Sequence, residues 1–421
     1  MSRRVAYAAL ALVCAVPRLV VLLHERDAIT ASFTEKSDTI ARMFVEHGTF
    51  GFVPGAPSAY TQPLYAWFLI PIYWIFGANW WSIGTAQILV AIATAWLVFE
   101  IGSRVLCRRA GLIAAAIATL NPYLVWHDVH VNREIVDQLV AAALVLLTLL
   151  VVERPTRWRA LLLGVVSGIS MLGNTRLVFI PILCAVYVAW RLPRARATAL
   201  VAALVLSGAA VAVAPWLVRN QLSVGCFTLT TDGRAMWKAN NPRTYHLLSS
   251  GQWIDNIGRH PPRPPAPGRL TPEDANGIWL RNGRALHPDE CLEMRFYQHL
   301  AVEWMREHPG DKAKLAALSA KVLWQPNVLE TSDRSGAGTQ LDVGRRVIEP
   351  AYMWVLYALA FVGLFFAPRA FVALALLLLA YQTAAALAFV GATRYRVAWD
   401  FLLAILAAAT VEHLIQRRRR R

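Results

Sequence analysis

The sequence of 421 residues is 57% hydrophobic and only 16% charged, whereas soluble domains carry about 45–50% apolar and about 25% charged residues. This composition excludes an ordinary soluble protein and predicts a chain embedded in a membrane. The formal net charge is +16, but the arginines fall in short clusters between apolar runs, which is typical of segments that orient a membrane protein. We therefore expect membrane lipid as a partner and no nucleic acid.

Ten apolar runs approach the roughly 17–25 residues that a membrane-spanning helix needs. They lie at residues 5–23, 80–103, 111–126, 135–152, 160–173, 177–190, 198–217, 351–367, 370–390 and 397–414. The first run lacks a small-residue cleavage site and leads into a charged loop, so we expect an uncleaved signal anchor. The predicted fold class is an all-α polytopic membrane protein of about ten transmembrane helices.

One further apolar run, residues 62–76 (QPLYAWFLIPIYWIF), is short and rich in prolines and aromatic residues. Arginine placement decides whether it spans, because Lys and Arg in short loops stay on the cytoplasmic side. If this run is an interfacial or re-entrant helix, both termini and all six basic clusters are cytoplasmic. The clusters are Arg3/Arg4, Arg104/Arg108/Arg109, Arg154/Arg157/Arg159, Arg191/Arg194/Arg196, Arg369 and Arg417 to Arg421. We therefore predict a juxtamembrane helix in the first outer loop.

This topology divides the chain into three parts. Residues 1–217 form a membrane module of seven spans with its candidate site in the first outer loop, 24–79. Residues 218–350 form an extracytoplasmic loop domain, and residues 351–421 supply three C-terminal spans and a basic cytoplasmic tail. Cys226 and Cys291 both lie in the loop domain. An oxidising compartment would allow a disulfide between them, but the sequence leaves their pairing open.

Two groups of polar residues in the outer loops could carry chemistry. Glu35 and Asp38 come just before a helical pattern, where a carboxylate at a membrane surface suits general-base catalysis. Asp38 is also well placed to cap that helix, and spacing alone favours capping over catalysis. After the third span, His127, His130 and Glu134 would share one helical face, but they match no established metal motif. A polar surface turn is favoured there over a metal site.

Arginines on the outer side oppose the positive-inside tendency and so need a reason to be there. Five lie at the outer ends of predicted spans: Arg133, Arg176, Arg219, Arg394 and Arg396. A phosphate-bearing lipid headgroup suits them chemically. The alternatives are pairing with Glu134 or Asp400, and contact with anionic phospholipid. Because Arg394 and Arg396 flank Tyr395 in a tight turn, this turn favours a phosphate clamp.

The long loop offers aromatic and amide side chains that suit a sugar ring. Asn240 follows a tryptophan-containing segment (WKAN) near the start of the loop. Such residues stack on and hydrogen-bond carbohydrate, although they are also common in ordinary loop packing.

These motifs together resemble the GT-C superfamily of polyprenyl-phosphate-dependent glycosyltransferases, in the branch that contains protein O-mannosyltransferases and the lipid A aminoarabinose transferase. The resemblance covers nearly the whole chain. It is carried by Asp38, residues 60–65 (YTQPLY) running to Phe76-Gly77, residues 121–134, residues 214–220 (APWLVRN), residues 308–310 (HPG) with Lys321 and Trp324, and residues 393–396 (TRYR).

The resemblance implies roles for particular residues. Asp38 would be the base that activates the acceptor, with Glu35 as the alternative because the family often pairs two acids here. The residues implied for the donor phosphate are Arg394, Tyr395, Arg396 and Arg176. The residues implied for other substrate contacts are Glu134, Tyr60, Gln62, Arg219 and Asn240.

The implied function is sugar transfer from a polyprenyl phosphate to an envelope glycan, lipid or protein acceptor on the extracytoplasmic face. The enzyme would be an inverting hexosyl- or pentosyltransferase. The donor is a substrate and no cofactor is expected, although a divalent metal could assist. The alternatives are a transporter or flippase of lipid-linked sugars and a non-catalytic envelope assembly protein. Transporters usually place ionisable or broken-helix features at mid-membrane, whereas the polar residues here collect outside.

Overall fold

The computed structural model describes residues 2–31, 36–192, 195–254, 257, 280–281, 284–285, 290–326 and 344–420. Helices dominate these residues. The strands that they contain form two short antiparallel pairs, β1 (Gly51–Val53) with β2 (Ala56–Pro57) and β3 (Leu280–Arg281) with β4 (Arg284–Ala285). The predicted all-α polytopic fold class is confirmed.

The ten predicted spans coincide with helices. Within the described part of the chain, five helical segments are long and apolar enough to cross a membrane: α1 (Arg3–Glu25), α5 (Trp80–Val105), α8 (Glu134–Glu153), Thr198–Ser223 within α11 (Ala195–Ser223), and α17 (Arg369–Ala388). The other predicted spans correspond to α6 (Arg108–Thr119) with α7 (Pro122–His127), α9 (Arg157–Gly173), α10 (Ile180–Arg191), α16 (Glu349–Gly363) and α19 (Asp400–Arg419). The short π-helix η3 (Gly344–Ile348) precedes α16.

The run 111–126, predicted as one span, is two helices. The residue before a proline is disfavoured in the α conformation, and Asn121 precedes Pro122 at this break. The Asn121 side chain then caps α7, accepting a hydrogen bond from the Tyr123 backbone N–H over 3.1 Å. The break turns the chain toward Asp128 and the start of α8.

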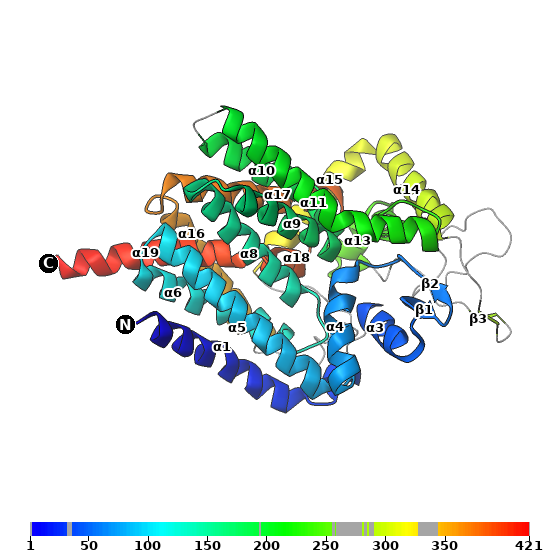
Figure 1. The fold of residues 1–421 in the computed structure, drawn as a ribbon, viewed down its shortest axis with the longest axis horizontal. Coiled ribbons are helices and arrows are strands. Elements are labelled where there is room, and N and C mark those ends of the chain that lie inside the picture. Colours follow the sequence, from blue (N-terminus) through cyan, green and yellow to red (C-terminus); the bar gives the residue numbers. More distant parts are fainter. Residues whose placement is uncertain are drawn as a thin grey trace.

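The short apolar run is the helix α4 (Pro63–Phe76), and it crosses one end of the bundle. Pro63 begins it and Gly77, at φ 78°, ends it, as expected of proline at a first helical position and of glycine just past a helix. In Figure 1, α4 runs across the direction of α1 and α5, beside α3 (Lys36–His47). The short helix α2 (Ala28–Ala31) contacts α1 and α5. This orientation supports the prediction of an interfacial or re-entrant helix.

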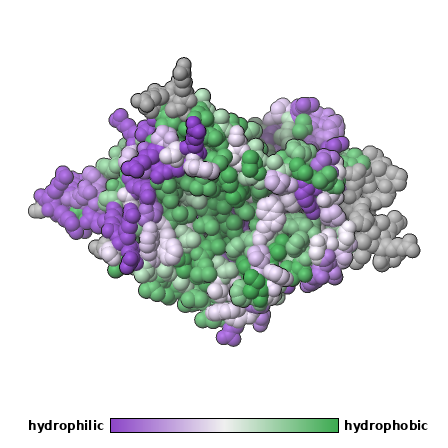
Figure 2. All heavy atoms as spheres, viewed as in Figure 1, coloured by the Kyte–Doolittle hydropathy of each residue, from purple (hydrophilic) through white to green (hydrophobic). Residues whose placement is uncertain are grey.

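The bundle has two distinct ends. Both chain termini lie at one end, and α3, α4 and α14 (Glu290–Glu307) lie at the other (Figure 1); we call these the terminal end and the loop end. Figure 2 shows a broad apolar surface between them, with hydrophilic side chains gathered toward the terminal end. There Arg109 donates to the Glu412 carboxylate, over 2.7 Å from its Nε. Arg3, 3.8 Å from Glu100, belongs to the same region. Basic clusters that are far apart in sequence therefore share one end.

Glycines allow close contact between α9 and α11. A Cβ at Gly164 would clash with the Val205 backbone carbonyl, and one at Gly208 would clash with the Leu161 carbonyl. Small residues of this kind let helix backbones approach closely in membrane proteins. This packing fixes the turn after α9, which carries Arg176.

The loop domain contains α12 (Gly233–Ala239), α13 (Thr244–Ser249), α14 (Glu290–Glu307) and α15 (Pro309–Trp324). Cys226 and Cys291, whose pairing the sequence left open, form a disulfide with a Cα–Cα distance of 5.9 Å. Leu315 of α15 packs with Ala239 and with Val390, which follows α17. The loop domain is therefore attached to the membrane helices near the turn 391–396.

A buried ion pair joins α1 to the turn after α7. The Arg18 guanidinium donates to the Asp128 carboxylate over 2.7 and 2.9 Å and to the Thr119 carbonyl over 3.0 Å. Both charged side chains are almost inaccessible. This pair holds the polar turn that leads to Glu134.

Candidate active site

Three arginines from separate segments meet at the loop end. Arg133 lies just before α8, Arg176 lies in the turn η1 (Thr175–Leu177), and Arg394 lies in α18 (Thr393–Val397). Together with Tyr395 and Glu134 they form what we call the arginine cluster. The turn that carries Arg394 packs tightly on α15, because a Cβ at residue 391 would clash with the Ser319 carbonyl and only glycine fits.

Tyr395 and Glu134 connect the three arginines. The Arg176 guanidinium carbon lies 3.6 Å from the centre of the Tyr395 ring, and Arg394 donates to the Tyr395 hydroxyl over 3.0 Å. Glu134 Oε1 lies 3.8 Å from Nε of Arg394 and 3.9 Å from Nε of Arg133. As the first residue of α8, Glu134 also benefits from the positive end of the helix dipole.

Gln62 connects the cluster to the start of α4. Although Gln62 stands at the N-cap position, its side chain bridges two neighbours. Its carbonyl oxygen accepts from Arg133 over 2.8 Å, and its amide donates to Thr175 Oγ1 over 3.3 Å. The structure thus brings Gln62 together with Glu134, Arg176, Arg394 and Tyr395, which the sequence proposed from separate motifs.

The arginine cluster carries more positive than negative charge and is largely shielded from solvent. The Glu134 side chain is 5% exposed and that of Arg394 is 26% exposed. The cluster contains three guanidinium groups and this one carboxylate, which lies near those of Arg133 and Arg394. Even with Asp137, which lies one turn further along α8, positive charge exceeds negative.

The pKa values of the cluster reflect this surplus. Burial lowers the pKa of Arg176 to about 10, and the neighbouring charges of Arg133 and Arg394 add to the lowering. Burial alone would raise the pKa of Tyr395, but Arg176, Arg394 and Arg133 outweigh it and lower that pKa. An anion between these groups would favour the charged guanidinium forms. The arrangement therefore suits a phosphate group.

Asp38 forms a second polar group, on α3. The helix begins at Lys36, so Asp38 lies inside its first turn and not at the N-cap position that the spacing favoured. Its carboxylate pairs with Arg42 Nε over 3.0 Å and accepts a hydrogen bond from the Tyr73 hydroxyl. The side chain is 13% exposed. Glu35, the alternative base, lies outside the described residues.

The two groups lie along one helix. Asp38 contacts Tyr73 near the end of α4, whereas the arginine cluster contacts Gln62 at its start. Eleven residues of α-helix rise about 16 Å. The Lys36 ammonium, however, lies 4.3 Å from the centre of the Tyr60 ring, so α3 reaches back toward the start of α4. Both groups therefore share the loop end.

Arg396, predicted to bind phosphate with Arg394, has different partners. Its side chain is 1% exposed and pairs with Asp400 over 3.0 Å. It also donates to the carbonyls of Leu323, over 2.7 Å, and Gln325, over 3.1 Å. Arg396 thus supplies hydrogen-bond donors to the carbonyl groups at the end of α15. It also pairs with Asp400, which was the alternative to phosphate binding that the sequence left open.

Three other residues predicted to contact substrate hold loops in place. Arg219 donates to the Ser58 carbonyl over 2.8 Å, and Asn240 accepts from the Lys312 ammonium over 2.6 Å. Tyr60 is buried, and its carbonyl accepts from Thr230 Oγ1 over 2.9 Å. These contacts place the three residues beside the site as its framework.

The sequence analysis missed Tyr73 and Trp253. The ring centre of Trp253 lies 5.3 Å from the Arg394 guanidinium carbon, and no sequence pattern indicates this contact, because the two residues are far apart in the chain. Arg42, by contrast, stands four residues after Asp38, a spacing at which helical ion pairs form. That spacing could have revealed the pair.

The two histidines of the polar turn have separate contacts. The His130 ring lies 2.8 Å from the Trp126 carbonyl oxygen through Nδ1 and 3.5 Å from Glu25 through Nε2. His127 stacks on Tyr123, with ring centres 3.9 Å apart. Among the residues that the structure describes, no group of three or more His, Cys, Asp or Glu side chains is arranged to hold a metal ion.

Part of the chain that carries this site matches a known protein family. Residues 57–218 match the sequence model of a family described as dolichyl-phosphate-mannose-protein mannosyltransferase. That segment contains α4, α8, Gln62, Glu134 and Arg176. No curated protein sequence matches the chain.

Two solved structures are similar over nearly the whole chain. AglB from Archaeoglobus fulgidus, an archaeal oligosaccharyltransferase in complex with an inhibitory peptide and a dolichol-phosphate, is 11% identical at a TM-score of 0.53; 98% of this chain and 50% of AglB are covered. ArnT from Cupriavidus metallidurans, bound to undecaprenyl phosphate, is 15% identical at a TM-score of 0.45; 97% of this chain and 77% of ArnT are covered. This chain thus spans about half the length of AglB.

The chain is a multi-pass membrane protein, and the likeness to AglB is one of fold. The family match over residues 57–218 agrees with the resemblance to the GT-C superfamily that the motifs predicted.

Proposed function

We propose that this chain is a membrane glycosyltransferase that takes a sugar from a polyprenyl-phosphate carrier and transfers it to a glycan, lipid or protein acceptor at the extracytoplasmic face. The observation that carries this proposal is the arginine cluster, whose surplus positive charge lies largely buried at the loop end. A phosphate leaving group needs its negative charge stabilised as the bond to the sugar breaks. Fixed guanidinium groups in a water-poor site supply that stabilisation.

Asp38 is the proposed general base. It takes the proton of an acceptor hydroxyl while the acceptor oxygen attacks the anomeric carbon. The bond between that carbon and the phosphate oxygen breaks, and the polyprenyl phosphate leaves with the electron pair, toward the arginine cluster. The sugar is inverted, and the proton stays on Asp38 until solvent removes it. Arg42 and Tyr73 fix the carboxylate, and the charge stabilisation in this step comes from side chains, so we expect no dependence on a divalent metal.

Two observations support a site on the extracytoplasmic side. Cys291 of the disulfide Cys226–Cys291 belongs to α14, which lies at the loop end (Figure 1), and disulfides persist in oxidising compartments. The basic clusters that contain Arg3 and Arg109 lie at the terminal end, which is the cytoplasmic end if the positive-inside tendency holds. Both chain termini would then be cytoplasmic.

The surface of α4 suits a lipid carrier. Trp74 is 78% exposed, and Ile75 and Phe76 beside it are also exposed. Aromatic side chains of this kind prefer the interface between membrane and water. Because Gln62 at the start of the same helix contacts the arginine cluster, a carrier lying along α4 would bring its phosphate to the three arginines.

The test is transfer by the purified protein from a polyprenyl-phosphate sugar, comparing wild type with Asp38→Asn. General-base catalysis contributes about 10²- to 10⁴-fold, so kcat should fall by that factor while donor binding persists. Asp311→Asn is the matched control, because Asp311 also lies in the first turn of a helix and pairs with a basic residue, Lys314, over 3.2 Å. Turnover retained by Asp38→Asn would remove Asp38 from the mechanism.

A transporter of lipid-linked sugars is the second candidate, because Arg18 and Asp128 form an ionisable pair buried in the bundle, and such groups often mark transport paths. Proteoliposomes separate the two functions. A transporter moves the intact carrier lipid between leaflets without an acceptor, whereas a transferase releases polyprenyl phosphate only when an acceptor is present. A non-catalytic assembly protein does neither.

A further inference from the structure

The segment that leads into α4 is held by the loop domain through its backbone. The Arg219 guanidinium donates to the Ser58 carbonyl over 2.8 Å. The Thr231 backbone N–H donates to the Ala59 carbonyl over 2.9 Å. Residues 58–60 therefore depend for their position on Arg219, near the end of α11, and on the backbone that follows that helix.

Glu290 joins this segment to α14. Its carboxylate oxygen Oε2 accepts from the Ala59 backbone N–H over 2.9 Å and from Thr231 Oγ1 over 2.7 Å. Glu290 is buried, 231 residues away from Ala59 in sequence. A buried carboxylate with two donors anchors both of them, because leaving either donor unpaired would cost free energy.

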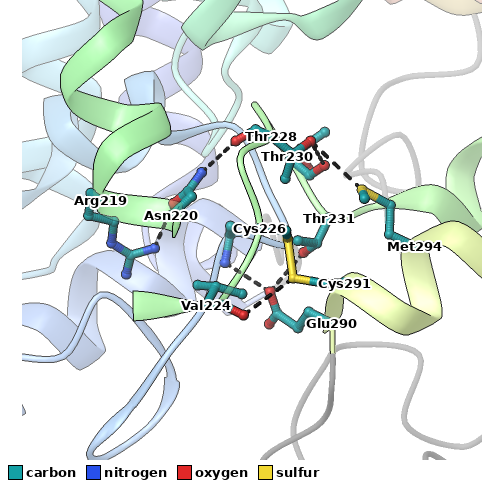
Figure 3. Close-up of a disulfide and its surroundings, with 11 residues drawn as sticks. Arg219, Asn220, Val224, Cys226, Thr228, Thr230, Thr231, Glu290, Cys291 and Met294 are labelled. Atoms are coloured by element: carbon teal, nitrogen blue, oxygen red, sulfur yellow. Dashed lines mark hydrogen bonds between the residues drawn. A yellow bond between two sulfur atoms is a disulfide. The ribbon is translucent and has the colours of Figure 1, made fainter. Parts of the chain in front are cut away.

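The disulfide fixes Glu290 in turn. Cys291 is the next residue of α14, and its partner Cys226 precedes Thr231 by five residues. Figure 3 shows the disulfide beside Glu290 and Thr231, with Met294 of α14 facing Thr228. The bond thus ties together the two segments between which Ala59 is held.

The held segment continues directly into the arginine cluster. Gln62 follows Ala59 by three residues, and its side chain contacts Arg133 and Thr175. A shift at Ala59 therefore moves the residue that links α4 to the cluster.

We propose that Glu290 is a positioning residue for the donor-phosphate site, acting through Ala59 and Gln62, and that the Cys226–Cys291 disulfide holds Glu290 in place. The part of this inference that concerns the donor rests on the proposed function. Glu290 touches neither substrate nor the reacting atoms in this scheme. It should therefore affect the donor KM and leave kcat nearly unchanged.

The first experiment compares Glu290→Ala and Glu290→Gln in the full-length protein. Loss of the carboxylate in Glu290→Ala should raise the donor KM about tenfold, equivalent to about 1.4 kcal/mol, and should speed hydrogen exchange at residues 58–62. Because the amide oxygen of a glutamine side chain can accept the same bonds, Glu290→Gln should restore most of the affinity. Glu303→Gln is the matched control, because Glu303 lies exposed on the same helix.

The second experiment tests the disulfide. A dithiol reductant converts the disulfide to two thiols and is itself oxidised to a disulfide. Reduction of the wild type should raise the donor KM and the exchange at residues 58–62, as Glu290→Ala does. Cys226→Ser/Cys291→Ser should show the raised values without reductant and should not respond to it.

The outcomes separate this inference from the proposed function. An unchanged donor KM in Glu290→Ala overturns the positioning role, whether or not exchange increases. Unchanged exchange at residues 58–62 overturns the anchoring by Glu290 itself. If the wild type fails to transfer sugar from every polyprenyl-phosphate donor tested, the proposed function fails. The hydrogen-exchange measurement still decides whether Glu290 anchors residues 58–62.

Discussion

Arg394 and Arg396 stand two residues apart, yet the structure predicts opposite consequences for their loss. Arg394 belongs to the arginine cluster and is partly accessible, near the rings of Tyr395 and Trp253. Arg396 is buried against Asp400 and the end of α15. Replacing each in turn therefore distinguishes a binding residue from a structural one within a single turn of chain.

The expected losses of donor affinity and of stability follow from the contacts that each substitution removes. A charge-assisted hydrogen bond to phosphate contributes about 1.5–3 kcal/mol, so Arg394→Ala should weaken donor binding about 10- to 150-fold. Its melting temperature should change little. Arg396→Ala leaves Asp400 buried without its main partner, and breaking a buried pair costs about 3–5 kcal/mol. That variant should melt at a clearly lower temperature or fail to accumulate.

The assays are donor titration and thermal unfolding of the purified protein in detergent. Lysine at each position is the informative companion, because it keeps the charge but loses the planar fork of donors. Arg394→Lys should recover part of the donor affinity. Arg396→Lys should remain destabilised, because one ammonium cannot satisfy Asp400 and the carbonyls of α15 together. Equal losses of donor affinity at both positions, with stability unchanged, would refute this division of roles.

Two further predictions concern stability. Arg18→Ala should destabilise the protein by about 3–5 kcal/mol; adding Asp128→Ala should recover much of the loss in thermal unfolding, and no recovery would argue against the pair. Burial lowers the pKa of Lys312 from 10.5 to about 8, so between these values the unfolded state binds more protons and stability rises with pH. The melting temperature of wild type relative to Lys312→Met should therefore increase from pH 8 to pH 10, and a constant difference would contradict this.

The membrane helices were predictable because their signal is local. Long apolar runs define spans wherever they occur, and the placement of Arg109 and of the C-terminal arginines indicated their common end. The break at Asn121-Pro122 was missed because hydropathy alone joined the two flanking helices. The chain order of the helices therefore followed from sequence more reliably than their individual ends.

The candidate site was predictable only in part. Arg176 and Arg394 stood out because an arginine at an outer span end opposes the positive-inside tendency, whereas Glu134 was implied by the family resemblance. Arg396 lies at an outer span end as well, but its side chain points toward α15 and Asp400. No short sequence motif encodes that packing. Trp253 and Tyr73 were missed because an aromatic residue in a loop or an apolar helix has many ordinary uses. The partners of these residues are set by packing between segments that are distant in the sequence.

The buried pair between Arg18 and Asp128 also constrains how the protein is made. The two residues are 110 positions apart, so α1 emerges from the ribosome well before its partner exists. Placing an arginine within a membrane helix costs a few kcal/mol during insertion, and the apolar remainder of α1 must offset this at first. Arg18 can reach its final partner only after the chain through Asp128 has been synthesised, so α1 completes its docking late in assembly.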